Sequence, residues 1–297
     1  MGWLIAILVL PVLAGCRGSG PVTQERPLVI TTFTVLADMA RTVAGDHLRV
    51  ESITKLGAEI HGYEPTPSDL RRIAGASLVL ENGLNLERWS DRFLAGMPNL
   101  KRSTLSAGIK PLPITEDAYR GKPNPHAWMS PRLAEIYVEN IRQAFSQLDP
   151  ANAEDYRRRA EAYRAQLRAL DLELRRELAT IPGPRRVLAS CEGAFTYLAH
   201  DYGLDEAYLW PVNSESQVTP QRMARLIATV RQRQVPAVFC ESTVSDKVQR
   251  QVAEQTGARF GGVFYVDSLS SPQGEAPTLL KLQRHNVRTL IQGLKGS

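Results

Sequence analysis

The sequence lacks the features that would indicate a hydrolase or a nucleic-acid-binding protein. It contains neither the H-E-x-x-H motif of zinc metalloproteases nor the G-x-S-x-G motif of serine hydrolases, so no motif supports either class of hydrolase. The formal net charge is +5, but the basic residues do not gather into a patch interleaved with aromatic residues. Much of the excess lies between Arg157 and Arg176, where it alternates with acidic residues. This pattern predicts a solvated, ion-paired helix face and argues against nucleic acid as a partner.

A long apolar run is missing from the N-terminal segment as well. The stretch from Trp3 to Leu13 is shorter than the ~20 residues that cross a bilayer, and it ends in Leu13-Ala14-Gly15-Cys16, the pattern of a bacterial lipoprotein cleavage site. We therefore expect residues 1–16 to be an export signal, Cys16 to carry the lipid and residues 17–27 to be a flexible tether. Lys and Arg are absent before the run, so an upstream start or an uncleaved anchor stays open. In either case the rest of the chain is exported.

Cysteine is scarce, and after Cys16 only Cys191 and Cys240 are left. Each ends a short apolar run and is followed at once by Glu, which suggests two neighbouring strands that end side by side. In an oxidising compartment a disulfide between them is plausible. It would close a loop of about 50 residues and stabilise the fold by ~4 kcal/mol on the chain-entropy model. Two buried free thiols are the alternative, since the sequence does not give the distance between the two Cα atoms.

Strand-like and helix-like segments alternate in both halves of the chain, and 297 residues suit two domains better than one core. Strands are predicted at 29–33, 48–53, 78–81, 187–190, 207–210, 237–239 and 262–266, and helices at 35–44, 68–74, 194–202, 220–233, 245–257 and 276–294. An uninterrupted helical pattern fills residues 150–182. We therefore predict an α/β fold with two parallel-sheet lobes, residues 28–149 and 183–297, joined by one long rigid helix.

Two imidazoles and two carboxylates lie where they could share one divalent metal ion: His61, His126, Glu192 and Asp267. The two histidines lie in Pro/Gly-rich loops of the first lobe, and the two acids lie at strand ends of the second. Ligands of open α/β sheets gather beyond the carboxyl ends of the strands, so the ion is expected in the cleft between the lobes. A lone histidine is more often a surface or core residue than a ligand. We assign no metal role to the other three, His47, His200 and His285.

Five segments resemble the metal-binding solute receptors of manganese, zinc and iron ABC importers: Glu59–Asp69, Asn124–Pro131, Ser190–Leu204, Leu209–Glu215 and Val238–Lys247. The resemblance covers nearly the whole mature chain and looks closest to the manganese-binding lipoproteins, with Cys191 and Cys240 placed as in the disulfide-bearing cyanobacterial type. It implies two lobes on a rigid helix, the same four ligands, and no enzymatic activity. It also implies a membrane permease with its ATPase as partner, and a lipid anchor that holds the receptor, expected to be a monomer, on the periplasmic or extracellular side.

The ligand chemistry favours Mn²⁺, with Fe²⁺ and Zn²⁺ as alternatives. Two carboxylates offset the charge of a divalent ion and can supply extra oxygen contacts, whereas zinc prefers four ligands with more nitrogen or sulfur. The zinc receptors of the family commonly bring a third His and a His-rich loop, but Glu192 stands at that position and residues 101–125 contain no His. Because both imidazoles must be neutral to bind the ion, affinity should fall as the pH drops through about 6.5.

Two readings from other classes stay open at this point, a metallohydrolase and a surface adhesin with a purely structural metal. A hydrolase would need an open coordination position and a separate base, for which Glu64 or Glu241 could be proposed. A further hypothesis concerns Cys191, the neighbour of Glu192. Reduction of a disulfide there would loosen a ligand-bearing strand end and weaken metal binding, or the crosslink is only stabilising.

Overall fold

The first half of the molecule is built on one parallel sheet, in the strand order β2-β1-β3-β4. The computed structural model describes residues 25–116, 119–213 and 218–295. The strands are β1 (Leu28–Thr31), β2 (Arg49–Ser52), β3 (Leu78–Glu81) and β4 (Arg102–Thr104). Because the strands are parallel, their carboxyl ends share one edge of the sheet, and the loops that follow them lie together there.

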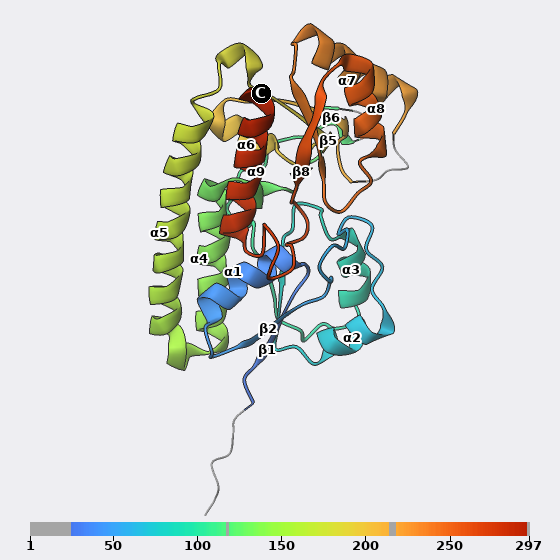
Figure 1. The fold of residues 1–297 in the computed structure, drawn as a ribbon. Coiled ribbons are helices and arrows are strands. Elements are labelled where there is room, and N and C mark those ends of the chain that lie inside the picture. Colours follow the sequence, from blue (N-terminus) through green and yellow to red (C-terminus); the bar gives the residue numbers. More distant parts are fainter. Residues whose placement is uncertain (1–24, 117–118, 214–217, 296–297) are drawn as a thin grey trace, which may run out of the picture.

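Four helices accompany this sheet: α1 (Thr34–Ala44), α2 (Pro67–Ala74), α3 (Arg88–Leu94) and α4 (Pro131–Leu148). Helix α2 begins at a capping box, in which Thr66 and Asp69 each accept from the other's backbone N–H, with Pro67 at the first helical position. Ile73 and Leu94, from α2 and α3, pack with Ile30 in a small separate core. Helices α1 and α4 pack against each other away from that core, as Figure 1 shows.

The second half contains two parallel strand pairs, β5 (Val187–Glu192) with β6 (Asp205–Trp210) and β7 (Ala237–Glu241) with β8 (Arg259–Phe264). Strands β5 and β7 are adjacent, and the Cys191–Cys240 disulfide joins them near their carboxyl ends. The helices are α6 (Thr196–Tyr202), α7 (Pro220–Gln232), α8 (Lys247–Thr256) and α9 (Leu279–Lys295). Short 3₁₀ turns lie at Ala127–Met129, Pro150–Asn152 and Gly183–Arg185.

The long helix α5 (Ala153–Leu178) runs along one side of both halves (Figure 1). Its 26 residues span about 39 Å at ~1.5 Å per residue. It packs on α1 and α4 of the first half and on α9 of the second. The predicted apolar stripe is buried, from Tyr156 to Leu174, and the opposite face carries ion pairs such as Arg157–Glu154 and Arg168–Glu161. The helix therefore fixes the two halves to a common support.

The α/β class with parallel sheets was predicted correctly, but three elements were missed: α3, β4 and α4. Strand β8 also begins three residues before its predicted range, because Ala237 of β7 pairs with Arg259. Most buried apolar residues form one continuous cluster through both halves, so the lobes share a core. The lobe boundaries 28–149 and 183–297 stay a prediction.

The expected signal and most of the expected tether, including Cys16, lie outside the described residues. Within the ranges that the structure describes, no helix has both the length and the apolar character needed to cross a bilayer.

Candidate metal centre

The four residues predicted to bind metal converge on one point between the two halves. One ligand atom from each of His61, His126, Glu192 and Asp267 lies within 4.8 Å of the others. Glu192 Oε1 is 3.1 Å from His61 Nε2 and 3.5 Å from His126 Nε2, and Asp267 Oδ1 is 3.9 Å from His126 Nε2. This spacing lets one small cation contact all four side chains.

Each ligand candidate follows a strand or a turn that holds it in place. Glu192 is the last residue of β5, and Asp267 lies three residues beyond β8, so the expectation that it terminates a strand was slightly wrong. His126 directly precedes the 3₁₀ turn at Ala127–Met129. His61 lies in the loop between β2 and α2, where its backbone N–H donates to Glu59 Oε1 at 2.6 Å. Two ligand candidates therefore come from each half, as predicted.

Burial separates three of these side chains from the fourth. His126, Glu192 and Asp267 are fully buried, whereas the side chain of His61 is 11% exposed. Both carboxylate oxygens of Glu192 and Oδ1 of Asp267 are buried without a hydrogen bond of good geometry. Buried carboxylate oxygens are costly unless they are paired, so this donor set is suited to a divalent cation.

The two imidazoles have pKa values shifted in opposite directions. Burial lowers the pKa of both, but the Glu192 carboxylate beside His61 outweighs burial and raises its pKa to about 9. For His126 burial prevails, and its pKa falls below the usual value. His61 Nε2 lies 3.1 Å from Glu192 Oε1 and 3.1 Å from His126 Nε2, so the proton that the raised pKa keeps on His61 points into the site when no metal is bound. A bound ion would take the place of this proton.

The two carboxylates also diverge. Burial would raise the pKa of Glu192, but the charges of His126 and His61 lower it to about 2. Burial and the nearby Glu192 charge raise the pKa of Asp267 well above its ordinary value. Glu192 is therefore the permanent anion of the metal-free site, and Asp267 gains its charge when a cation arrives.

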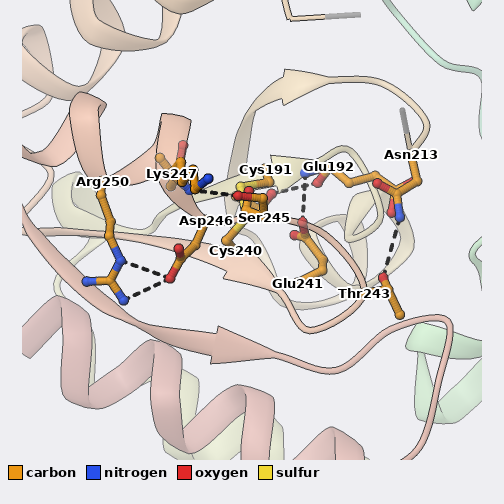
Figure 2. Close-up of a disulfide and its surroundings, with 12 residues drawn as sticks. Cys191, Glu192, Asn213, Cys240, Glu241, Thr243, Ser245, Asp246, Lys247 and Arg250 are labelled. Carbon is orange, nitrogen blue, oxygen red and sulfur yellow. Dashed lines mark hydrogen bonds and ion pairs between the residues drawn. A yellow bond between two sulfur atoms is a disulfide. The ribbon is translucent and has the colours of Figure 1, made fainter. Parts of the chain in front are cut away.

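The disulfide lies next to Glu192, as Figure 2 shows. The Cα atoms of Cys191 and Cys240 are 4.8 Å apart, so the alternative of two free thiols is wrong. Glu241 follows Cys240 and is buried, and its Oε2 accepts from the backbone N–H of Glu192 at 3.1 Å. Burial and the charge of Glu192 raise the pKa of Glu241 well above its usual value. Because Cys191 and Cys240 are oxidised, they cannot join Glu241 in a second metal site.

A cavity of about 450 Å³ opens beside His61. Arg88, Lys122 and Asn213 line it, and Asn213 Nδ2 lies 3.5 Å from Asp267 Oδ2. His61 is the only one of the four ligand candidates that lines it.

The remaining histidines have other partners, as the sequence suggested. His47 Nε2 lies 2.7 Å from Asp155 at the start of α5, His200 contacts Asp201, and His285 bonds the carbonyl of Val263. Sequence reasoning missed the polar residues that hold the ligands, above all Asn124, whose Oδ1 lies 2.9 Å from His126 Nδ1. Its place two residues before a candidate ligand was the available signal.

Comparisons with known proteins identify metal-binding relatives of this chain. The family model described as zinc-uptake complex component A, periplasmic, matches residues 29–293. The iron-binding protein YfeA of Yersinia pestis is 50% identical over 271 residues, which cover 91% of this chain and 87% of that protein. The metal ABC transporter substrate-binding lipoprotein ScbA of Streptococcus cristatus is 29% identical over 298 residues, covering 98% and 96%.

A solved structure gives the same picture. The Mn-bound periplasmic metal-binding protein from Candidatus Liberibacter asiaticus superimposes with a TM-score of 0.84 at 37% sequence identity. The match covers 90% of this chain and 99% of that one.

Proposed function

This chain belongs to the zinc-uptake complex component A family, and on that premise we propose that it captures Mn²⁺ outside the cytoplasm and delivers it to an ABC-type importer. As a member of that family it is the substrate-binding component of a metal ABC transporter, and it is not an enzyme. A membrane permease and its ATPase are the partners that such a component serves. The proposal concerns the particular ion and the residues that hold it.

The observation that carries the proposal is the donor set. Two fully buried carboxylates, with both oxygens of Glu192 and Oδ1 of Asp267 lacking a good hydrogen bond, face two imidazoles within 4.8 Å. Carboxylate and imidazole ligands with room for several oxygen contacts suit Mn²⁺ better than Zn²⁺, which prefers four ligands richer in nitrogen or sulfur. We assign the four ligand roles to His61, His126, Glu192 and Asp267. The Mn-bound relative from Candidatus Liberibacter asiaticus supports the same ion.

Fe²⁺ is the second candidate, because the relative at 50% identity is named an iron-binding protein. Fe²⁺ lies next to Mn²⁺ in the order of divalent-metal affinities and accepts the same ligand types. Zn²⁺ would bind such a site more tightly than either ion in vitro, so affinity alone does not identify the cargo. Uptake of radiolabelled Mn²⁺ and Fe²⁺ by cells with and without the gene does.

The binding role is tested by following free Mn²⁺ with EPR while the metal-free protein is titrated. We expect the free-ion signal to stay low up to one equivalent, and Asp267→Ala to abolish most of this binding. His200→Ala is the matched control, since His200 lies away from the site with its side chain 64% exposed. If free Mn²⁺ is seen from the first addition and Fe²⁺ binds tightly in an anaerobic calorimetric titration, the manganese proposal fails and Fe²⁺ becomes the proposed cargo.

We further propose that Cys16 carries a lipid that anchors a monomeric receptor to the membrane. The pattern Leu13–Cys16 supports this, and several relatives are named lipoproteins. The lobes at 28–149 and 183–297 would close slightly on α5 when the ion binds. Mass spectrometry of the membrane fraction, with Cys16→Ala as control, tests the anchor.

A further inference from the structure

Asn124 is a buried amide placed two residues before His126. It is 2% exposed, and its Oδ1 accepts the backbone N–H of His126 at 3.0 Å. The same oxygen lies 2.9 Å from His126 Nδ1. One end of this amide therefore meets both the backbone and the ring of a candidate ligand.

The other end of Asn124 reaches the second half of the molecule. Its Nδ2 lies 2.7 Å from the carbonyl oxygen of Gly193 and 3.0 Å from Thr196 Oγ1. Gly193 directly follows Glu192, and a side chain does not fit at this position, because a Cβ would come within 2.8 Å of the Tyr208 ring. Asn124 thus joins the strand end that carries one candidate ligand to the loop that carries another.

Backbone groups fix which end of the amide is oxygen. The Gly193 carbonyl can only accept, so it requires the NH₂ end of Asn124, and the backbone N–H of His126 can only donate, so it requires the oxygen. Thr196 agrees with this, because its hydroxyl donates to Glu206 Oε2 at 2.7 Å and so accepts from Asn124. Turning the amide over would create a donor–donor and an acceptor–acceptor clash.

The orientation of the amide decides where the His126 proton resides. An amide oxygen has no hydrogen to give, so His126 Nδ1 can approach it at 2.9 Å only as N–H. A neutral imidazole has one N–H, which leaves the lone pair on Nε2. That nitrogen faces Glu192 Oε1 and Asp267 Oδ1.

A second bond across the halves mirrors the first. Trp128, two residues after His126, donates from Nε1 to the carbonyl of Val266 at 3.2 Å, and Val266 directly precedes Asp267. Asn124 and Trp128, on either side of His126, therefore bond to the neighbours of the two carboxylates Glu192 and Asp267. Of Asn124 and Trp128, only Asn124 also forms a hydrogen bond with the His126 imidazole.

We propose that Asn124 is a positioning residue that holds His126 in the Nδ1–H tautomer, so that Nε2 is ready to bind metal, and that couples His126 to the strand end bearing Glu192. The inference rests on the proposed ligand role of His126. It goes beyond that role by naming the residue that sets ligand tautomer and reach.

The direct test is an ¹⁵N NMR spectrum of the metal-free protein with ¹⁵N-labelled histidine, assigned by comparison with His126→Gln. We expect His126 Nδ1 to be of the N–H type and Nε2 to be of the unprotonated type. A proton on Nε2 would overturn the inference without any further variant. Failure to bind Mn²⁺ by a protein with the expected tautomer would count against the proposed function and not against Asn124.

Asn124→Ala separates positioning from general stabilisation. We expect it to give a mixture of His126 tautomers and to weaken Mn²⁺ binding about 10–100-fold, the usual cost of losing an outer-shell partner. Thr196→Val and Trp128→Phe are the matched controls, because each removes one bond of the same network and leaves the acceptor of His126 in place. Both should keep the wild-type tautomer. An unchanged tautomer in Asn124→Ala, or the same mixture in either control, would contradict the assignment.

Discussion

His61 and His126 have the same side chain and both come from the first half of the chain, yet the structure gives them different properties. His126 is fully buried and is held by bonds that reach the second half, and its pKa is lowered. His61 borders a cavity, its loop is held by the nearby Glu59, and its pKa is raised to about 9. The comparison teaches that one imidazole is prepared for metal while the other holds the proton that metal must displace.

The strongest test of this contrast is to remove each ring in turn. We expect His126→Ala and His61→Ala each to lower Mn²⁺ affinity by more than the ~10–100-fold that an outer-shell loss costs. His126→Ala should be the more damaging, because a buried cavity is left beside Glu192 and Asp267. Calorimetric titration measures both. A larger loss for His61→Ala would reverse the order that we draw from burial.

The next effect is that of pH on the wild-type protein. Because metal displaces the His61 proton, affinity should rise about tenfold per pH unit from pH 7 toward pH 9, with a further contribution from Asp267. An ordinary histidine would place this change near pH 6.5, and the raised pKa of His61 moves the expected range upward. Mn²⁺ affinity measured between pH 6 and 8.5 checks this. In His61→Gln the rise above pH 7 should be smaller, and an equal rise would assign the proton elsewhere.

The same shift predicts the stability of the metal-free fold. The pKa of His61 in the folded protein lies above its unfolded value of about 6.5. Its contribution to the free energy of unfolding is therefore complete below pH 6.5 and is lost as the pH rises through about 9. We expect the melting temperature of the metal-free protein to fall across this range. His61→Gln is the control. A fall of the same size in that variant would show that another group is responsible.

A smaller effect on affinity is expected from the disulfide, which supports the end of β5 that carries Glu192 and, through Gly193, the bond to Asn124. Cys191→Ala with Cys240→Ala should lower stability by up to ~4 kcal/mol, since the bridge joins residues 49 positions apart. Mn²⁺ affinity should fall less than tenfold. Denaturant unfolding and metal titration separate the two effects. If affinity is unchanged, the crosslink is only structural and the reduction hypothesis fails.

The smallest expected effect is at the His61 loop. Glu59 accepts from the backbone N–H groups of His61 at 2.6 Å and Gly62 at 2.8 Å. Glu59→Gln should keep one of these hydrogen bonds and make it neutral instead of charge-assisted. We therefore expect Mn²⁺ release to become about two- to fivefold faster, which corresponds to ~0.5–1 kcal/mol. Stopped-flow release into a chelator measures it. Glu64→Gln, in the same loop, is the control and should leave the rate unchanged.

The parts of the fold that were predictable are those in which local pattern and tertiary role coincide. Helix α5 has a continuous apolar stripe and Pro150 and Pro182 around it, so its existence followed from periodicity. Helix α4 was not predicted, although its buried residues Tyr137, Val138 and Ile141 show helical spacing. The class of fold did not depend on it.

For the site, residue types and strand ends identified the four ligand candidates, but the sequence could not show how they differ. The raised pKa of His61 depends on a carboxylate 131 residues away in sequence, at 3.1 Å in space. The role of Asn124 depends in the same way on the carbonyl of Gly193. Such effects are set by tertiary distance and burial, which no local pattern contains.

The shared core described above determines how cargo can leave. The apolar cluster passes from one half to the other beside α5, so the halves cannot separate without exposing apolar surface to water. At ~25 cal/mol per Å², exposing 200 Å² would cost about 5 kcal/mol. Spontaneous wide opening would therefore be confined to about one molecule in several thousand. The receptor should therefore release little bound metal before it docks. Opening of the site for metal release should depend on docking to the permease.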